Sequence, residues 1–372
     1  MNNRTTAILV FASVLHALAA AAVTAGAETA AAETAEARAV GARTAETYLV
    51  QPDGSGDFPT IAEAVVQVSE GDIIELGDGT FSGDDNRDVD LGGKMIVIRS
   101  RSDQPGACVI ECGGSPSEHH RAFYLNAGET LDTRIEGLTI RGGWHKAGGG
   151  ISVGVGSAVT IRNCIFESNG ALGVGGGLHS NGTCVVTGCV FRNNASQSGC
   201  AIAASGPITM SGTTVYGNEG EFAAGLLALG GGHVLNCTFA DNRATTVDGG
   251  IVKSMIEVLE LESCIIAENL QGGAVYCCCD GDIAFSCCNL YGNEGGDWVS
   301  CGEGQLGLNG NISEAPRFCR DELPETPYAL SAGSPCCEEQ QPECGRIGAW
   351  PVGCDDTAVT PASWGTVKSL FR

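Results

Sequence analysis

Hydrophobic residues alternate with other residues over short stretches in the middle of the chain. Apolar pairs two positions apart recur at Val159 and Ile161, Cys184 and Val186, Ile208 and Met210, Leu259 and Leu261, and Ile283 and Phe285. A period of two residues is typical of a β-strand. After Ile161 the next apolar residue, Cys164, comes three positions later, so its side chain faces inward only if the chain turns between them. The pattern predicts two short strands that meet at a corner.

The skipped position in each repeat predicts where the chain turns. It holds mostly residues that tolerate a left-handed or tightly turned backbone, namely Asn163, Gly188, Gly212, Asn236, Ser263 and Cys287. A third apolar stretch follows a glycine cluster in most repeats, as from Gly148 to Val153. Three strands per repeat are therefore expected. They are too short for isolated hairpins, and no helical periodicity separates them, so the chain must coil directly onto itself.

The whole pattern recurs at steps of 24 to 27 residues. Each copy closes on an asparagine, and these are Asn169, Asn194, Asn218, Asn242, Asn269 and Asn293. Five residues earlier lies a column of mostly cysteines, which are Cys164, Cys189, Cys237, Cys264 and Cys288. A weaker copy around Leu138, Ile140 and Gly143 comes first. Repeats of this length predict a solenoid, in which each strand pairs in parallel with its copy about 4.8 Å away.

These repeats resemble those of secreted bacterial proteins with a right-handed parallel β-helix, of the pectate-lyase-like (pectin lyase) superfamily. The resemblance implies an all-β fold with three short strands per coil and a short N-terminal capping helix. That architecture serves lyases, hydrolases, esterases, adhesins and inert stalks alike, so it implies no single activity.

We expect a single β-helix domain over residues 47–354, with a cap at each end. Thr60 and Glu63 make a capping box, and apolar residues at helical spacing predict a helix from about Ile61 to Val68 in an N-terminal cap, residues 47–80. Core repeats occupy residues 135–296, and a cysteine-rich C-terminal cap is expected over residues 313–354. Residues 48–65 resemble the opening segment of pectinesterases. The later catalytic motifs of that family have no counterpart in this sequence.

The N-terminus predicts export. Arg4, an apolar run to Val23 and the small residues before position 28 are typical of a signal peptide over residues 1–27, followed by a flexible leader over 28–46. A membrane anchor is the alternative, but the run is short and rich in alanine. We expect residues 355–372 to form a tail that is a sorting or attachment segment, the stump of a lost domain, or a frayed end. We expect a secreted or cell-surface monomer on the outer surface of a bacterium, with no transmembrane segment after signal removal.

Charge and cysteine content narrow the partners and the compartment. Twenty Lys and Arg against 44 Asp and Glu give a net charge of −24, which argues against nucleic acid and anionic membranes. Nineteen cysteines in an exported chain indicate an oxidising compartment. We expect the inward cysteines to pack as small apolar side chains. The disulfide candidates lie beyond the repeats, at Cys319, Cys336, Cys337, Cys344 and Cys354.

The run Cys277–Cys279, with Cys287 and Cys288 nearby, raises the question of a metal site. Consecutive residues on a strand point to opposite faces, whereas zinc needs converging ligands. We therefore expect strand cysteines or disulfides here and no metal. The asparagine column likewise has a structural explanation, because stacked side-chain amides hydrogen-bond to each other and to the backbone of the turn.

Candidate chemistry is confined to loops that break the period. A polysaccharide lyase needs a base and acidic calcium ligands on one outward face, and no such column emerges. The isolated candidates are Asp84, Asp85, Asp88, Asp90, Trp144, His145, Lys146, Asp297 and Trp298, each of which also fits a solvated loop.

Two hypotheses follow from these observations. The first, which we favour, is an exported scaffold that binds a polysaccharide or another cell-surface component through its loops, with no catalytic residue and no cofactor; calcium stays open. The second is a carbohydrate-active enzyme, either a polysaccharide lyase or a glycoside hydrolase. Its site would form from the loops around Asp84 to Asp90 and Trp144 to Lys146.

Overall fold

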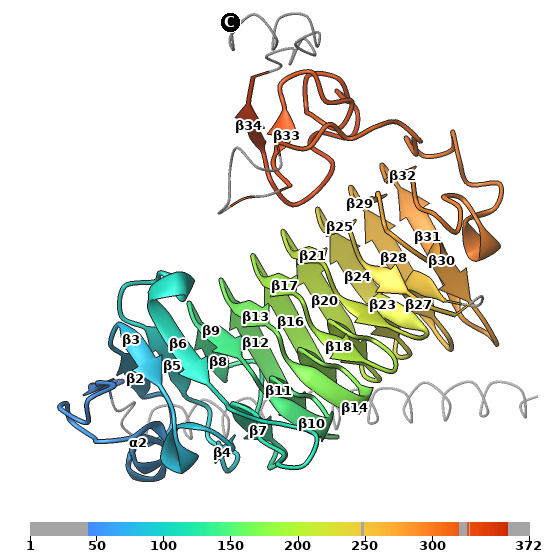
Figure 1. Ribbon diagram of the computed structural model, residues 1–372. Coiled ribbons are helices and arrows are strands. Elements are labelled where there is room, and N and C mark those ends of the chain that lie inside the picture. The colour runs from blue at the N-terminus through green and yellow to red at the C-terminus, as the bar shows by residue number, and fades with distance from the viewer. Residues whose placement is uncertain (1–43, 247–248, 320–325, 327, 356–372) are drawn as a thin grey trace, which may run out of the picture. The chain divides into compact units, whose positions relative to one another are not determined.

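The computed structural model describes residues 44–246, 249–319, 326 and 328–355 (Figure 1). The predicted signal peptide, most of the leader and nearly all of the tail lie outside the described residues. The chain divides into two compact units, Met1–Ala45 and Glu46–Arg372, and the second contains the solenoid.

Four parallel sheets make up the solenoid over the described residues. Successive coils add strands to the first three sheets, and the fourth has only five strands. The first sheet contains β1 (Thr47–Val50), β2 (Ile73–Leu76), β5 (Val97–Ser100), β8 (Arg134–Glu136), β12 (Ala158–Arg162), β16 (Thr183–Thr187), β20 (Ile208–Ser211), β24 (Gly232–Leu235), β28 (Val258–Glu262) and β31 (Asp282–Ser286). The second contains β3 (Gly79–Phe81), β6 (Cys108–Glu111), β9 (Thr139–Arg141), β13 (Ile165–Glu167), β17 (Val190–Arg192), β21 (Thr214–Tyr216), β25 (Thr238–Ala240), β29 (Ile265–Ala267) and β32 (Asn289–Tyr291). These two sheets confirm the strands expected on either side of the corner.

The third sheet follows the glycine clusters, as expected. It contains β4 (Val89–Asp90), β7 (Phe123–Leu125), β11 (Ile151–Val153), β15 (Leu178–Ser180), β19 (Ile202–Ala204), β23 (Ala223–Ala228), β27 (Gly250–Ser254) and β30 (Gly273–Cys277). A fourth, which we name the edge sheet, was not predicted and contains β10 (Trp144–Ala147), β14 (Gly170–Val174), β18 (Ala195–Ser196), β22 (Glu219–Gly220) and β26 (Arg243–Ala244). The remaining elements are α2 (Ile61–Gln67), η1 (Asp84–Asn86), η2 (Pro105–Ala107), η3 (Ser300–Gly302), β33 (Leu330–Ser331) and β34 (Val352–Cys354).

All six predicted corner residues have a left-handed backbone, with φ between 49° and 61°. A second left-handed position stands directly before each ladder asparagine, with φ between 52° and 69°, and was not predicted. Its residues are Ser168, Asn193, Gly217, Asp241, Glu268 and Gly292. Each regular coil therefore turns sharply twice, and the ladder asparagine follows the second turn.

The asparagine column forms a continuous hydrogen-bonded ladder inside the solenoid. The backbone N–H and the side-chain Nδ2 of Asn194 both donate to Oδ1 of Asn218, at 2.9 and 3.0 Å. Nδ2 of Asn194 also donates to the carbonyl of Phe166 in the preceding coil. The same pattern repeats from Asn169 to Asn293, and every member is nearly fully buried. Each amide thus satisfies buried backbone groups of the preceding coil and hydrogen-bonds to the next amide of the ladder.

The five cysteines of the inward column are buried and form no disulfide. They share the core with stacked aromatic side chains, such as Phe166 and Phe191, whose ring centroids are 4.4 Å apart. Burial raises the pKa of the Cys164, Cys264 and Cys288 thiols. These thiols are therefore protonated and unreactive at neutral pH.

Helix α2 covers the N-terminal end of the coil with Ile61, Ala64 and Val65. Its N-cap is Thr60, whose Oγ1 accepts a hydrogen bond from the Glu63 N–H, as the capping box predicts. The first sheet begins at β1, so regular coils already exist within the segment assigned to the cap.

The structure describes residues 313–319, 326 and 328–354 of the expected C-terminal cap. The far end of the solenoid is covered by residues 297–312, where Trp298 packs edge-on against Phe285 and Asn311 accepts the N–H of Cys288. Residues 328–354 instead pack beside the second sheet, where Ile265 and Ala267 form a cluster with Leu330 and Ile347. All three residues of β29 are apolar and buried, so its outer face needs a cover as well as its inner one.

Three disulfides are present, and only part of this set was expected. Cys319 bonds to Cys354, while Cys344 bonds to Cys287 and Cys277 to Cys301. Cys336 and Cys337 were expected in disulfides, but both are buried free thiols. Sγ of Cys336 accepts a hydrogen bond from Asn289 Nδ2, and Sγ of Cys337 donates to the carbonyl of Ser334. Both sulfur atoms therefore form hydrogen bonds within the packed segment.

Candidate functional site

The loop between β6 and β7, residues 112–122, departs from the regular coil and brings a histidine-rich segment to the third sheet. It is held to β10 by two backbone hydrogen bonds: the His120 N–H donates to the Trp144 carbonyl at 2.9 Å, and the Trp144 N–H donates back at 2.7 Å. Residues from two segments of the chain are thereby fixed beside each other.

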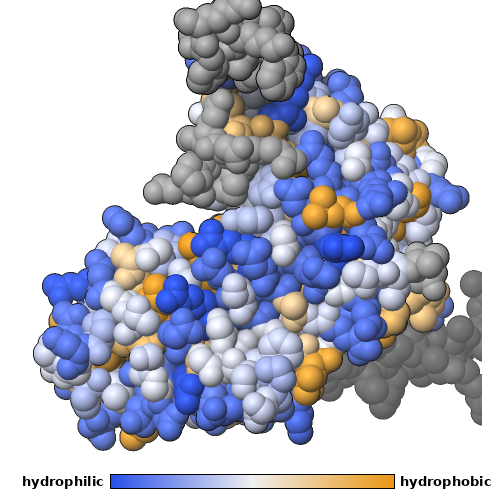
Figure 2. All heavy atoms as spheres, viewed as in Figure 1, coloured by the Kyte–Doolittle hydropathy of each residue, from blue (hydrophilic) through white to orange (hydrophobic). Residues whose placement is uncertain are grey.

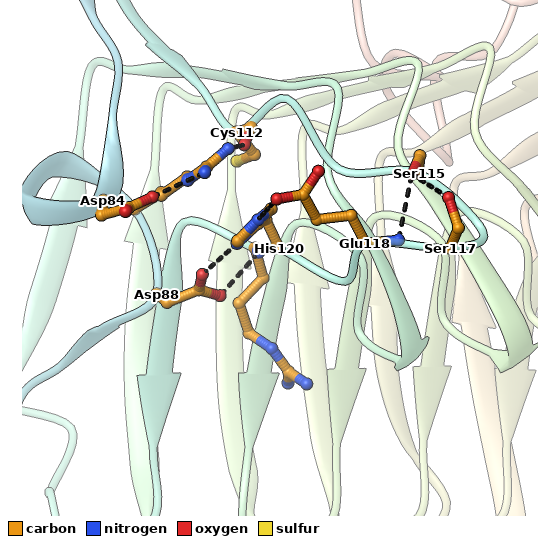
Figure 3. Close-up of polar contacts among 9 residues, drawn as sticks. Asp84, Asp88, Cys112, Ser115, Ser117, Glu118 and His120 are labelled. Carbon is orange, nitrogen blue, oxygen red and sulfur yellow. Dashed lines mark hydrogen bonds and ion pairs between the residues drawn. The ribbon is translucent and has the colours of Figure 1, made fainter.

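Asp88 anchors the same loop from the other side. Its Oδ2 lies 2.6 Å from Nδ1 of His120, and its Oδ1 accepts the N–H of Arg121 at 3.0 Å (Figure 3). Glu118 Oε1 lies 3.5 Å from Nε2 of the same imidazole, which is an electrostatic contact rather than a good hydrogen bond. Asp88 itself has a left-handed backbone, with φ of 52°. This carboxylate therefore positions both His120 and Arg121.

Arg121 is the most deeply placed cation of this region. Its side chain is only 7% exposed and lies over the ring of Tyr124, with Cζ 5.4 Å from the ring centroid. Burial lowers the pKa of its guanidinium, and the nearby charge of Asp88 opposes that shift. No carboxylate in the described ranges forms an ion pair with this guanidinium.

An open pocket of about 430 Å³ lies over these residues. Its lining consists of Asp88, Arg121, Tyr124, His145, Lys146, Ala147, Ser152 and His179. Tyr124, Ser152 and His179 occupy one register position on β7, β11 and β15, so they form an outward column of the third sheet. The structure thus brings Asp88 together with His145 and Lys146, the two loops that the enzyme hypothesis had joined.

Both histidines of the pocket are held in their neutral form. Burial lowers the pKa of His145 to about 4, assisted by the charge of Arg121, and burial also lowers the pKa of His179. The Nδ1 atoms of both rings are buried and have no hydrogen-bond partner within the described residues. The rings of His119 and His145 are 5.3 Å apart. At neutral pH the pocket therefore combines charged Arg121 and Lys146 with uncharged imidazoles.

The other predicted loop residues lie outside this pocket. Asp84 pairs with Arg87 at 2.6 Å, which lowers its pKa, and Asp85 is exposed on η1. Asp90 accepts the N–H of Gly92. Trp144 belongs to the edge sheet, and its indole lies so close to Gly170 on the next strand that no side chain fits there.

Asp297 and Trp298 have structural roles at the far end of the coil. Asp297 accepts hydrogen bonds from Asn293, and Trp298 packs on Phe285. Neither lines the pocket, so the structure gives no support to their choice as ligand residues.

Arg121, Tyr124, Ser152 and His179 were not chosen from the sequence. Two signals were available. Four of the six histidines of the chain, His119, His120, His145 and His179, gather here, and a basic residue directly follows the first pair. Ser152 and His179 share one position in the glycine-led strands of the repeat, but Tyr124 lies on β7, which precedes the regular part of the repeat, so the register that adds it to this column was not visible.

Two surface properties bear on the class of protein. On the face shown in Figure 2, hydrophobic residues form small groups among hydrophilic ones. Within the described residues, no helix has the length and apolar character needed to cross a membrane. Among those residues, one group has side chains close enough to share a metal ion, Cys277, Asp282 and Cys301, and its two sulfur atoms form a disulfide.

Among comparisons with known proteins, a family match agrees with the solenoid. No curated protein matches the chain. A pectin methylesterase from carrot is 13% identical, with a TM-score of 0.40 and coverage of 74% of this chain and 90% of its own. A pectate lyase is also 13% identical, with a TM-score of 0.41 and coverage of 84% and 98%. At these values neither structure bears on the activity of this chain. The family described as "Right handed beta helix region" matches residues 121–313, more than half of the chain. With its parallel coils, its asparagine ladder and this match, the chain belongs to the right-handed β-helix family.

Proposed function

We propose that this protein is an exported β-helix that binds an acidic carbohydrate in the pocket over β7, β11 and β15. The observation that carries the proposal is the nearly buried guanidinium of Arg121, which stacks on Tyr124 and has no carboxylate partner in the described ranges. A buried cation without a partner is costly, so an incoming anion gains more there than at an exposed site.

The remaining lining suits a sugar. Ser152, Tyr124 and the two neutral histidines offer hydroxyl and imidazole groups that hydrogen-bond to sugar hydroxyls, and Lys146 adds a second positive charge. The net charge of −24 repels anions from the rest of the surface, so the pocket is a local exception. The three disulfides are consistent with an extracellular site of action.

Binding to immobilised glycans tests the proposal directly. The full chain is compared on a polyuronate, a sulfated glycan and a neutral glucan, and the same series is run with Arg121→Gln. A lost charge-assisted hydrogen bond at a buried site predicts a decrease of roughly tenfold or more in affinity for both acidic glycans. Arg162→Gln is the matched control, since Arg162 is exposed on the first sheet. Equal binding of the neutral glucan, or equal loss in the control, would overturn the proposal.

One observation favours a second candidate, polysaccharide lyase activity. His145 has a pKa of about 4 and a buried Nδ1 without a partner, so it is available as a neutral base. In β-elimination this imidazole removes the proton from the carbon next to the carboxylate of the sugar, and Arg121 neutralises that carboxylate. The new double bond forms as the glycosidic C–O bond breaks, and the departing oxygen takes a proton from solvent. Unsaturated products absorb in the ultraviolet, so incubation with a polyuronate tests for lyase activity. Binding without that absorbance would support carbohydrate binding and exclude the lyase reaction.

A further inference from the structure

The turn that follows β30 carries two cysteines with an unusual geometry. The Gly281 N–H donates to the Cys278 carbonyl at 3.2 Å, and Cys279 has a left-handed φ of 63°. This backbone brings the Sγ atoms of Cys278 and Cys279 to 3.7 Å from each other. The expectation that consecutive cysteines point apart holds on a strand, but these two lie in the turn beyond the strand end at Cys277.

These are also the accessible thiols of the molecule. All nineteen cysteines lie in the described ranges, and every unbonded one except this pair is buried. Cys279 is exposed and Cys278 is partly so. Solvent and dissolved ions therefore reach these two sulfur atoms first.

A disulfide between the two is geometrically unfavourable. Consecutive Cα atoms are about 3.8 Å apart, whereas unstrained disulfides need about 4.4 to 6.8 Å. A metal ion that bridges the two sulfurs does not require this larger Cα–Cα distance. With a Zn–S bond of about 2.3 Å and tetrahedral angles, the two sulfurs of a zinc site are about 3.8 Å apart. The observed separation of 3.7 Å matches this arrangement.

We propose that Cys278 and Cys279 form a two-sulfur binding site for a thiophilic divalent cation such as Zn²⁺. Both thiols lose a proton as the metal–sulfur bonds form, and no oxidant or reductant takes part. Solvent occupies the other coordination positions. The exposed carboxylates of Asp280 in the same turn and of Asp282 at the start of β31, and the net charge of −24, attract the cation. This site is independent of the carbohydrate pocket.

The release of protons on metal binding makes the metal affinity of the site depend on pH. Because the metal displaces both protons, its affinity increases with pH.

Cadmium titration of the full chain, without reductant, tests the site. Thiolate-to-cadmium charge transfer is read in the ultraviolet for the wild type, Cys278→Ser, Cys279→Ser and the double variant. We expect one cadmium per chain in the wild type, at least tenfold weaker binding in each single variant, and no absorption change in the double variant. Zinc should compete with cadmium and protect two thiols from a chromogenic disulfide reagent.

Cys336 and Cys337 supply the internal control, because they are also consecutive and unbonded but are buried. They remain intact in the double variant and should give no cadmium signal. Three results would overturn the site: no signal in the wild type, an unchanged signal in the double variant, or a peptide in which Cys278 and Cys279 are already joined. Circular dichroism of the variants establishes that they are folded.

Discussion

Asp297 takes the place of the next asparagine at the end of the ladder. The backbone N–H and Nδ2 of Asn293 both donate to Oδ1 of Asp297, at 2.8 Å each. Its other oxygen accepts the N–H of Gly292. The ladder would otherwise end on unpaired buried donors, so this carboxylate completes the hydrogen bonding of the last regular coil.

Replacing this terminal acceptor tests its structural role. Asp297→Ala should lower the free energy of unfolding by about 1–3 kcal/mol, because two buried donors of Asn293 lose their partner. Asp297→Asn keeps an Oδ1 acceptor and should cost clearly less. Urea unfolding followed by circular dichroism measures both. Equal losses in the two variants would show that charge, and not the acceptor position, matters.

The neutral His145 predicts a pH dependence of stability. Its pKa is about 4 in the folded chain against an ordinary 6.5. Between these values the unfolded chain binds more protons, so the imidazole makes the protein less stable as pH falls from about 6.5 to about 4. His145→Asn should remove part of this decline and leave stability at pH 7 nearly unchanged. Urea unfolding at several pH values in this range compares the two proteins. Parallel curves would contradict the burial of the neutral imidazole.

The corner at Ser263 predicts opposite effects of two substitutions. With φ of 51°, Ser263→Gly relieves backbone strain and should leave stability unchanged or slightly higher. Ser263→Val places a β-branched side chain in a left-handed conformation and should cost about 1–3 kcal/mol. Thermal unfolding measures the order of the three proteins. A valine variant as stable as the glycine variant would contradict the corner geometry.

The contacts of Lys94 with α2 predict that this side chain stabilises the N-terminal helix. Its Nζ donates to the carbonyls of Val65, Val66 and Val68 at 2.6 to 2.8 Å, at the C-terminal end of α2. A cation there pairs with unsatisfied carbonyls and with the negative end of the helix dipole. Lys94→Met should cost about 1–2 kcal/mol, while Lys94→Arg should retain much of the stability. Hydrogen exchange of the α2 amides locates the effect, which should be absent from the distant β31.

Periodicity in the sequence was sufficient to predict the coils. The parity break after Ile161 located the corner at Asn163, since apolar side chains must face inward on both sides of it. The second corner was missed although four of its six residues, Asn193, Gly217, Asp241 and Gly292, are types that accept a left-handed backbone. The inward residue that follows it is the polar ladder asparagine, so the apolar pattern shows no break in parity there. The cover over β29 was missed because an outward Ile265 does not show which segment will lie on it.

The pocket could be predicted only in part. Loops around Asp88 and His145 were identified because they break the period, but their proximity depends on strand register and on the path of residues 112–122. Arg121 and His179 come from segments far apart in sequence, and nothing local to either residue indicates that they share a pocket. The proximity of the Cys278 and Cys279 sulfur atoms was not predicted, because the alternation of side chains on a strand was assumed to continue past the end of β30 into the turn.

The paired backbone hydrogen bonds between His120 and Trp144 have a consequence for recognition. Since Arg121 follows the first of these residues and His145 follows the second, the two side chains are carried by one rigid unit that exists before any ligand arrives. Little conformational entropy is then lost on association, and the gain from each contact is retained in the affinity. A binding site held in this way favours a stiff ligand of fixed shape over a flexible one.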